Sequence, residues 1–136
     1  MINNLNYQKD QIIGNLNEDY AEEIIKEYLD LKHLIKLDKY DTFDFYNEEK
    51  NIFFEVKSRR NNYNKYPTTI IGYNKMLEAI NYKNVYFIFI FNDGDYYYKY
   101  DVNDNLMITI GGRWDRGKTE TKKYVHIPIE KLIKLQ

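Results

Sequence analysis

Two acidic residues and one lysine are spaced so that they could surround one metal ion and one phosphate. Asp44 lies in a stretch rich in aromatic residues, and Glu55 and Lys57 stand two positions apart in a second such stretch. Because alternate residues of a β-strand share one face, Glu55 and Lys57 point the same way if this stretch is a strand. Asp44 joins them if the two stretches pair as a hairpin in the matching register. Carboxylates so placed could hold Mg²⁺ or Mn²⁺ for attack on a phosphodiester, with Lys57 orienting the attacking water or neutralising developing charge.

The same residues also fit an ordinary protein surface. Asp44 could cap a turn, while Glu55 and Lys57 could form an ion pair on an exposed strand. A Glu-x-Lys tripeptide is common and exposed ion pairs are ordinary, so the tripeptide taken alone favours this simpler interpretation. The surrounding elements have to decide between the two.

The pattern of apolar residues predicts the elements that would position the three residues. Apolar residues recur at helical spacing from Asn17 to about Leu37, which predicts an amphipathic helix. Residues 42–46 and 51–57 are rich in aromatic and β-branched types, and a polar stretch separates them. This pattern predicts a β-hairpin that carries Asp44 on its first strand.

The rest of the chain continues the alternation of helices and strands. A polar stretch from Ser58 to Thr69, which contains Pro67, predicts a loop. We expect an α/β fold with a central mixed sheet flanked by helices, in a single domain over residues 1–136. The further elements are a helix from about Gly72 to Tyr82, a central strand buried on both faces over Val85–Phe91, strands over 96–101, 106–110 and 124–127, and a last short helix from Pro128 to about Leu135.

Composition narrows the kinds of metal site that the chain can build. The 136 residues include no Cys, which excludes disulfides, cysteine nucleophiles and thiolate zinc sites. His33 and His126 are the only two histidines, too few for a multi-histidine zinc or iron site. A metal must therefore bind oxygen ligands, as Mg²⁺ and Mn²⁺ do.

Basic residues gather in two places although the formal net charge is −1. This balance argues against a protein that coats nucleic acid, but two basic groups could form local phosphate-facing surfaces. No apolar run is long enough to span a bilayer, and the start of the sequence resembles no secretion signal, so we expect an intracellular protein without a membrane partner. The first basic group is Lys57, Arg59, Arg60 and Lys65, and the second is Arg113, Arg116, Lys118, Lys122 and Lys123.

The two hairpin stretches resemble the core motif of the PD-(D/E)xK nuclease superfamily, which has the restriction-endonuclease-like fold. The matching segments are Tyr40–Phe45 and Ile52–Arg59. Asp44 matches the aspartate of the motif, and the segment from Glu55 to Lys57 matches its (D/E)xK. Phe43 stands where the motif has proline. A basic loop such as residues 112–117 is similar to small phage- and virus-type members.

The resemblance also implies roles for individual residues. Asp44, Glu55 and Glu18 would bind the metal, with Glu18 contributed by the helix before the hairpin and Glu22, one turn further on, as its alternative. Lys57 completes the expected catalytic set of Asp44, Glu55, Lys57 and Glu18. The expected nucleic-acid-binding residues are Arg59, Arg60, Lys75, Arg113 and Arg116.

The function implied by the resemblance is that of a Mg²⁺-dependent or Mn²⁺-dependent nuclease whose partner is nucleic acid, with DNA expected first. Two alternatives stay open. One is a virion or replication-associated protein that binds nucleic acid without cutting it, and the other is an endoribonuclease, because the same carboxylates serve either backbone. Cleavage of both strands would require a homodimer or two encounters, and a viral protein of this kind would act in the host cell.

Overall fold

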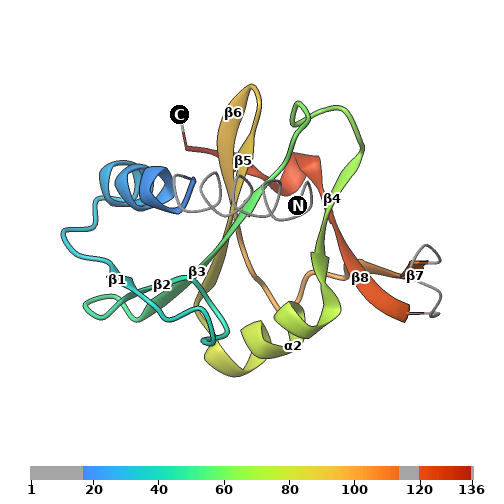
Figure 1. The fold of residues 1–136 in the computed structure, drawn as a ribbon, viewed down its shortest axis with the longest axis horizontal. Coiled ribbons are helices and arrows are strands. Elements are labelled where there is room, and N and C mark those ends of the chain that lie inside the picture. Colours follow the sequence, from blue (N-terminus) through green and yellow to red (C-terminus); the bar gives the residue numbers. More distant parts are fainter. Residues whose placement is uncertain (1–16, 114–119, 136) are drawn as a thin grey trace, which may run out of the picture.

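The computed structural model describes residues 17–113 and 120–135, which form two β-sheets and the helices around them (Figure 1). One helix covers residues 17–28, and α2 covers Tyr73–Tyr82. The larger, mixed sheet consists, in spatial order, of β1 (Ile35–Lys36), β2 (Phe45–Asn47), β3 (Ile52–Ser58), β5 (Val85–Phe91), β6 (Gly94–Lys99) and β9 (Ile133–Lys134). The smaller sheet consists of β4 (Thr68–Gly72), β8 (Glu120–Pro128) and β7 (Met107–Arg113). The predicted α/β class with a mixed sheet is confirmed.

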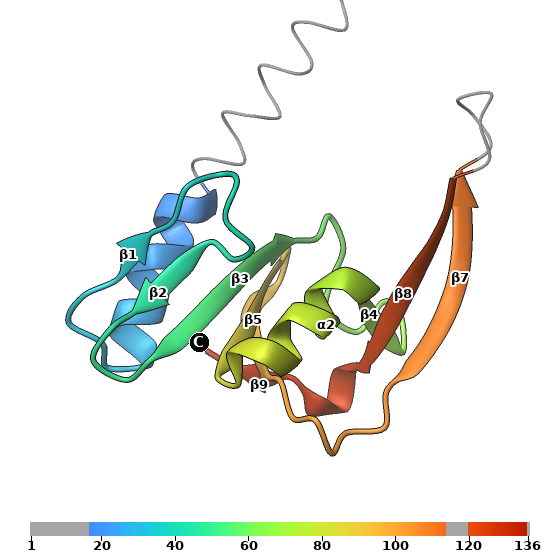
Figure 2. The ribbon, with the colours of Figure 1, turned by 90° about the horizontal axis from the view of Figure 1, so that it is seen from below.

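The larger sheet is covered on both faces (Figure 2). On one face, the helix of residues 17–28 buries Ala21 and Ile25 against Phe54 and Ile88. On the other face, α2 and the smaller sheet cover a second buried cluster, and alternate residues of β5 enter the two clusters, as its continuous apolar run predicted. The second cluster includes Ile71, Ala79, Phe87, Phe89, Val125 and Ile127.

The strands β3 and β5 lie side by side and run parallel because the chain between them leaves the larger sheet as β4 and returns through α2. Their register pairs Glu55 with Phe87 and Lys57 with Phe89. Parallel neighbours end at the same edge of a sheet, and the crevice beyond such carboxyl ends is where α/β proteins commonly bind ligands. The crossover therefore decides where a site can form.

The first helix is shorter than the periodicity predicted, because it ends at Tyr28 and does not reach Leu37. Asp30 adopts a left-handed conformation with φ of 53°, and the N–H of Leu31 donates to the carbonyl of Lys26 at 2.9 Å. This pattern closes a helix end in the Schellman manner. Leu31 remains buried after the helix has ended, so the apolar spacing continued past the true end.

Two further predictions were wrong because strand partners come from distant parts of the chain. Thr68–Gly72, expected to lie in or after a loop, forms β4 by pairing with β8, which begins about fifty residues later. The predicted helix after Pro128 is only a 3-10 turn, η1 (Ile129–Lys131), before β9 pairs with β6. The strands expected over 106–110 and 124–127 are confirmed and extended, as the β7–β8 hairpin.

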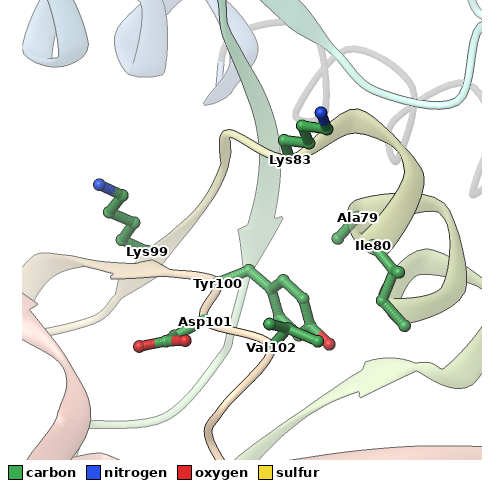
Figure 3. A pocket seen from close by; sticks show the side chains of 7 residues that line it. All are labelled: Ala79, Ile80, Lys83, Lys99, Tyr100, Asp101 and Val102. Carbon is green, nitrogen blue, oxygen red and sulfur yellow. The ribbon is translucent and has the colours of Figure 1, made fainter.

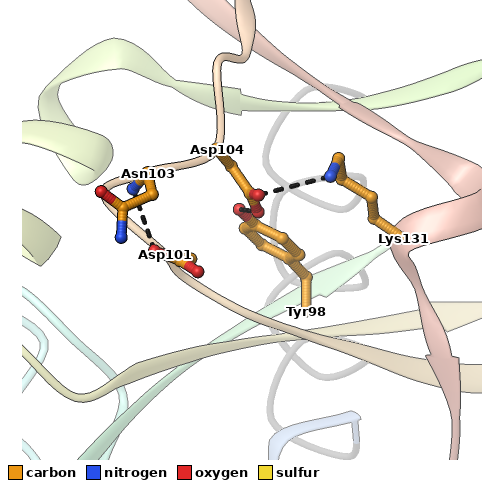
Figure 4. Close-up of polar contacts among 5 residues, drawn as sticks. All are labelled: Tyr98, Asp101, Asn103, Asp104 and Lys131. Carbon is orange, nitrogen blue, oxygen red and sulfur yellow. Dashed lines mark hydrogen bonds and ion pairs between the residues drawn. The ribbon is translucent and has the colours of Figure 1, made fainter.

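A polar contact fixes the chain where it passes from β6 to β7 (Figure 4). The hydroxyl of Tyr98 donates to Oδ2 of Asp104 at 2.6 Å, and Lys131 Nζ lies 3.3 Å from Oδ1 of the same carboxylate. The bond from Tyr98 lowers the pKa of Asp104, and burial together with this bond raises the pKa of Tyr98. The contact ties the larger sheet to the segment that leads into the smaller one.

The described helices include none that is long and apolar enough to cross a membrane.

Candidate active site

The hairpin register brings Asp44 next to Glu55. Phe45 pairs with Phe54 across β2 and β3, so the next position on each strand places Asp44 opposite Glu55. The N–H of Asp44 donates to the carbonyl of Phe54 at 2.9 Å, which extends the pairing one residue beyond β2. Oδ2 of Asp44 accepts a hydrogen bond from the N–H of Val56 at 2.7 Å. The carboxylate of Asp44 is therefore anchored to the β3 backbone beside Glu55.

Glu55 is a buried carboxyl group, only 5% exposed. Burial, followed by the nearby charge of Asp44, raises the pKa of Glu55 to about 7, while Lys75 and Lys57 act in the opposite direction. A carboxylate in such a place needs a positive partner, because desolvated charges without one are costly. The simpler interpretation of Glu55 as an exposed surface residue is therefore wrong.

Lys75, in the first turn of α2, provides that positive partner. Its Nζ lies 2.8 Å from Oε2 of Glu55. Among the described residues, this buried oxygen has no other partner. Lys75 also donates to the carbonyl of Thr42 and lies over the ring of Phe43 at 5.7 Å. Of the expected positions for Lys75, which were the site, the phosphate backbone and an exposed helix surface, the structure shows the first, beside the acidic pair.

Lys57 and Phe43 complete the surroundings of the acidic pair. Lys57 is half-buried on the same side of β3 as Glu55, and its positive charge lowers the pKa of Glu55. Phe43, which replaces the proline of the motif, is 2% exposed and packs edge-on against Tyr82 of α2 at 5.3 Å. The position before Asp44 therefore serves core packing under α2.

The helix glutamates lie apart from this group. Glu18 forms an ion pair with Lys36 at 3.3 Å, and Glu22 lies 3.8 Å from Lys26. Within residues 17–113 and 120–135, no three Asp, Glu or His side chains gather as a metal-binding group. The helix nevertheless reaches the end of β3, because Asn17 Nδ2 donates to the hydroxyl of Ser58 at 2.9 Å.

The donor set of Asp44 and Glu55 fits a hard divalent cation. Two adjacent carboxylates offer the oxygen ligands that Mg²⁺ and Mn²⁺ prefer. Their mutual repulsion, which helps to raise the pKa of Glu55, is the kind of strain that a bound cation relieves. In the metal-free protein, the ammonium of Lys75 supplies part of that positive charge.

The residues expected to bind nucleic acid differ in their exposure and contacts. Arg59 donates from Nη2 to the carbonyl of Ile70 at 2.6 Å and lies over the ring of Phe89 at 5.9 Å, so it links the end of β3 to β4. Burial lowers the pKa of Arg59. Arg60 is exposed. Arg113 ends β7, but its side chain is outside the described part, as is the whole of Arg116.

Two cavities lie at opposite ends of the larger sheet. One, of about 570 Å³, lies beyond the end of β3. The other, of about 510 Å³, lies at the opposite end of the sheet, between α2 and the segment after β6 (Figure 3). The close-up shows Ile80, Tyr100 and Val102 around this second cavity, with the ammonium groups of Lys83 and Lys99 directed away from it. Its lining shares no residue with the acidic group.

A mixed sheet with helices on both faces, whose hairpin places an aspartate opposite the glutamate of a Glu-x-Lys sequence, defines the PD-(D/E)xK class of proteins. A family model described as "Phage putative PDDEXK endonuclease" matches residues 16–135, and the chain belongs to this family. No match was found among curated proteins. The resemblance that the hairpin motif indicated is confirmed.

The raised pKa of Glu55 predicts a pH dependence of stability in the absence of metal. Between about 4.5 and about 7, the folded protein binds more protons at this residue than the unfolded chain does. The free energy of unfolding should therefore fall with rising pH by up to about 3 kcal/mol more in the native protein than in Glu55→Gln. Urea denaturation in EDTA from pH 4.5 to 8 measures the difference, and parallel curves would contradict it.

Lys75→Met should destabilise the metal-free protein at pH 8, because it leaves the Glu55 carboxylate buried without a cation. We expect a loss of about 2 kcal/mol in the free energy of unfolding, less than for a fully buried pair because Glu55 can take up a proton. Urea denaturation measures the loss, with the exposed Lys122→Met as the matched control. The loss should shrink at pH 5 and in a Glu55→Gln background, and a loss unchanged in both would contradict the pairing.

Proposed function

We propose that this protein is a divalent-metal-dependent endonuclease that hydrolyses phosphodiester bonds in DNA. The observation that carries the proposal is the buried carboxyl group of Glu55 beside Asp44, with Lys57 on the same side of β3, at the motif positions of a family described as endonucleases. Carboxyl groups whose pKa is raised by burial and a neighbouring charge are typical of functional sites.

Each residue of the group has a defined task in this proposal. Asp44 and Glu55 would hold the cation, which when bound polarises the phosphate and lowers the pKa of a water. The N–H of Val56 keeps Asp44 oriented toward Glu55. Lys57 would orient the attacking water or neutralise charge on the phosphate, and its half-buried position on the same side of β3 as Glu55 supports this role.

The proposed role of Lys57 predicts a loss of cleavage without a loss of folding. Lys57→Ala should lower the rate of DNA cleavage about 100-fold or more, since a positioned group of this kind contributes that much. Lys50→Ala is the matched control, because Lys50 is an exposed lysine at the turn of the same hairpin. The assay follows labelled DNA and RNA of one sequence with Mg²⁺ or Mn²⁺.

Equal cleavage by the native protein and Lys57→Ala would overturn the assignment of Lys57. Cleavage of the RNA with the DNA left intact would replace DNA by RNA as the substrate. The absence of cleavage of both would favour a protein that binds nucleic acid without cutting it.

The proposed metal ligands predict a calorimetric signal that is independent of activity. Mn²⁺ should bind the native protein, and Asp44→Asn or Glu55→Gln should weaken this binding at least about tenfold, because each removes one of two charged ligands. Glu18→Gln tests the third expected ligand, which must leave Lys36 to reach the ion. Glu23→Gln, at an exposed position of the same helix, is its control.

Binding that is unchanged in both Asp44→Asn and Glu55→Gln would overturn the metal site. Binding weakened by Glu18→Gln but not by Glu23→Gln would add Glu18 to it.

A further inference from the structure

The cavity beyond the end of β3 has no role in the proposed chemistry. Its volume of about 570 Å³ falls within the range of pockets that take small organic groups. Rings and apolar side chains form most of its wall, and one arginine and one histidine border it. The residues that matter here are Arg59, Tyr63, Tyr66, Pro67, Phe91 and His126.

The cavity lies beyond the acidic pair along the direction of β3. Lys57 pairs with Phe89, and the N–H of Arg59 donates to the carbonyl of Ile90 at 2.8 Å, so Arg59 continues the strand beside Phe91. Four residues of a strand span about 13 Å, which separates Arg59 at the cavity from Glu55 of the acidic pair. Stacked nucleotides advance about 3.4 Å each, so about four of them bridge this distance. A strand with its phosphate at the acidic pair would bring a base a few nucleotides away to the cavity.

The wall of the cavity is fixed in advance of any ligand. Tyr63 stacks on Tyr96 with ring centroids 4.7 Å apart, and its N–H donates to Asp93 at 2.9 Å. The two ring nitrogens of His126 lie 2.8 Å and 2.7 Å from the hydroxyls of Thr68 and Thr109. These contacts hold the cavity between the loop after β3 and the smaller sheet. A preformed pocket loses little entropy when a ligand binds.

Tyr66 differs from the other rings because its side chain is 55% exposed at the edge of the cavity. The segment from Arg59 to Tyr66 carries three cationic residues and no acidic one, which complements a phosphate backbone. Aromatic side chains beside a basic segment are the features that bind unpaired bases, because every base can stack on a ring. A base in a duplex cannot enter such a pocket unless it leaves its partner.

We propose that this cavity binds an unpaired nucleobase a few nucleotides from the phosphate that is cut, so that the substrate is single-stranded DNA or an unpaired segment of a duplex. The inference rests on the proposed function, because it places the base relative to the acidic pair. Tyr66 closes over the base, and Arg59 positions the wall by linking β3 to β4.

Fluorescence anisotropy in EDTA tests the proposal without cleavage, using a labelled twelve-nucleotide single strand and the blunt duplex of the same sequence. The native protein should bind the single strand more tightly, and Tyr66→Ala should weaken that binding about tenfold. Tyr66→Phe should retain it, because the ring does the stacking. Tyr28→Ala, at another exposed tyrosine on the opposite face of the sheet, is the control. Duplex affinity should be unchanged by Tyr66→Ala.

Equal binding of single strand and duplex by the native protein would overturn the proposal, as would an equal loss for both substrates in Tyr66→Ala. A single-strand preference that depends on Tyr66, in a protein that binds Mn²⁺ but cuts nothing, would overturn the nuclease and support the base pocket. Cleavage that depends on Lys57 but is indifferent to Tyr66 and to strandedness would support the nuclease and overturn the pocket.

Discussion

The burial of Glu55 beside Asp44 is the constraint around which the β2–β3 hairpin and α2 are arranged. A carboxyl group in this place must be protonated, paired with a cation or bound to a metal. In the metal-free protein, Lys75 forms the ion pair with Glu55. It reaches Glu55 because the first turn of α2 lies next to the hairpin. The position of α2 is thus tied to the electrostatics of β3 as well as to its apolar packing.

The parallel pairing of β3 with β5 explains why the segments that follow these two strands meet at one edge of the sheet, where the cavity lies beyond the acidic pair. The segment between these strands supplies Arg59, β4 and Lys75, so a single crossover builds the wall of the cavity and the cation of the acidic pair. In the smaller sheet, β4 is held in place by its pairing with β8. His126 on β8 also contacts the hydroxyls of Thr68 on β4 and Thr109 on β7, so it links all three strands of this sheet. The same segments therefore position the acidic pair and hold the fold together.

Local patterns predicted the elements whose partners are near in sequence. The β2–β3 hairpin, α2 and β5 followed from aromatic alternation, helical spacing and a continuous apolar run. The errors came from contacts with distant segments or from a local backbone reversal. The chain reverses at Asp30, so the apolar residues after Tyr28 pack from a loop and not from a helix. Both β4 and β9 form because strands distant in the sequence pair with them.

The sequence by itself determined the chemical set of Asp44, Glu55 and Lys57, because strand alternation and a short hairpin allow few other arrangements. The resemblance of these residues to the PD-(D/E)xK motif also indicated the family, which the match of the family model confirms. Only the tertiary structure decided that Glu55 is buried, that Lys75 is its partner and that Glu18 pairs with Lys36. These outcomes depend on how the crossover of residues 59–84 and the two sheets pack together. Burial and the distances between charged groups, which set their pKa values and ion pairs, are fixed only in the packed structure.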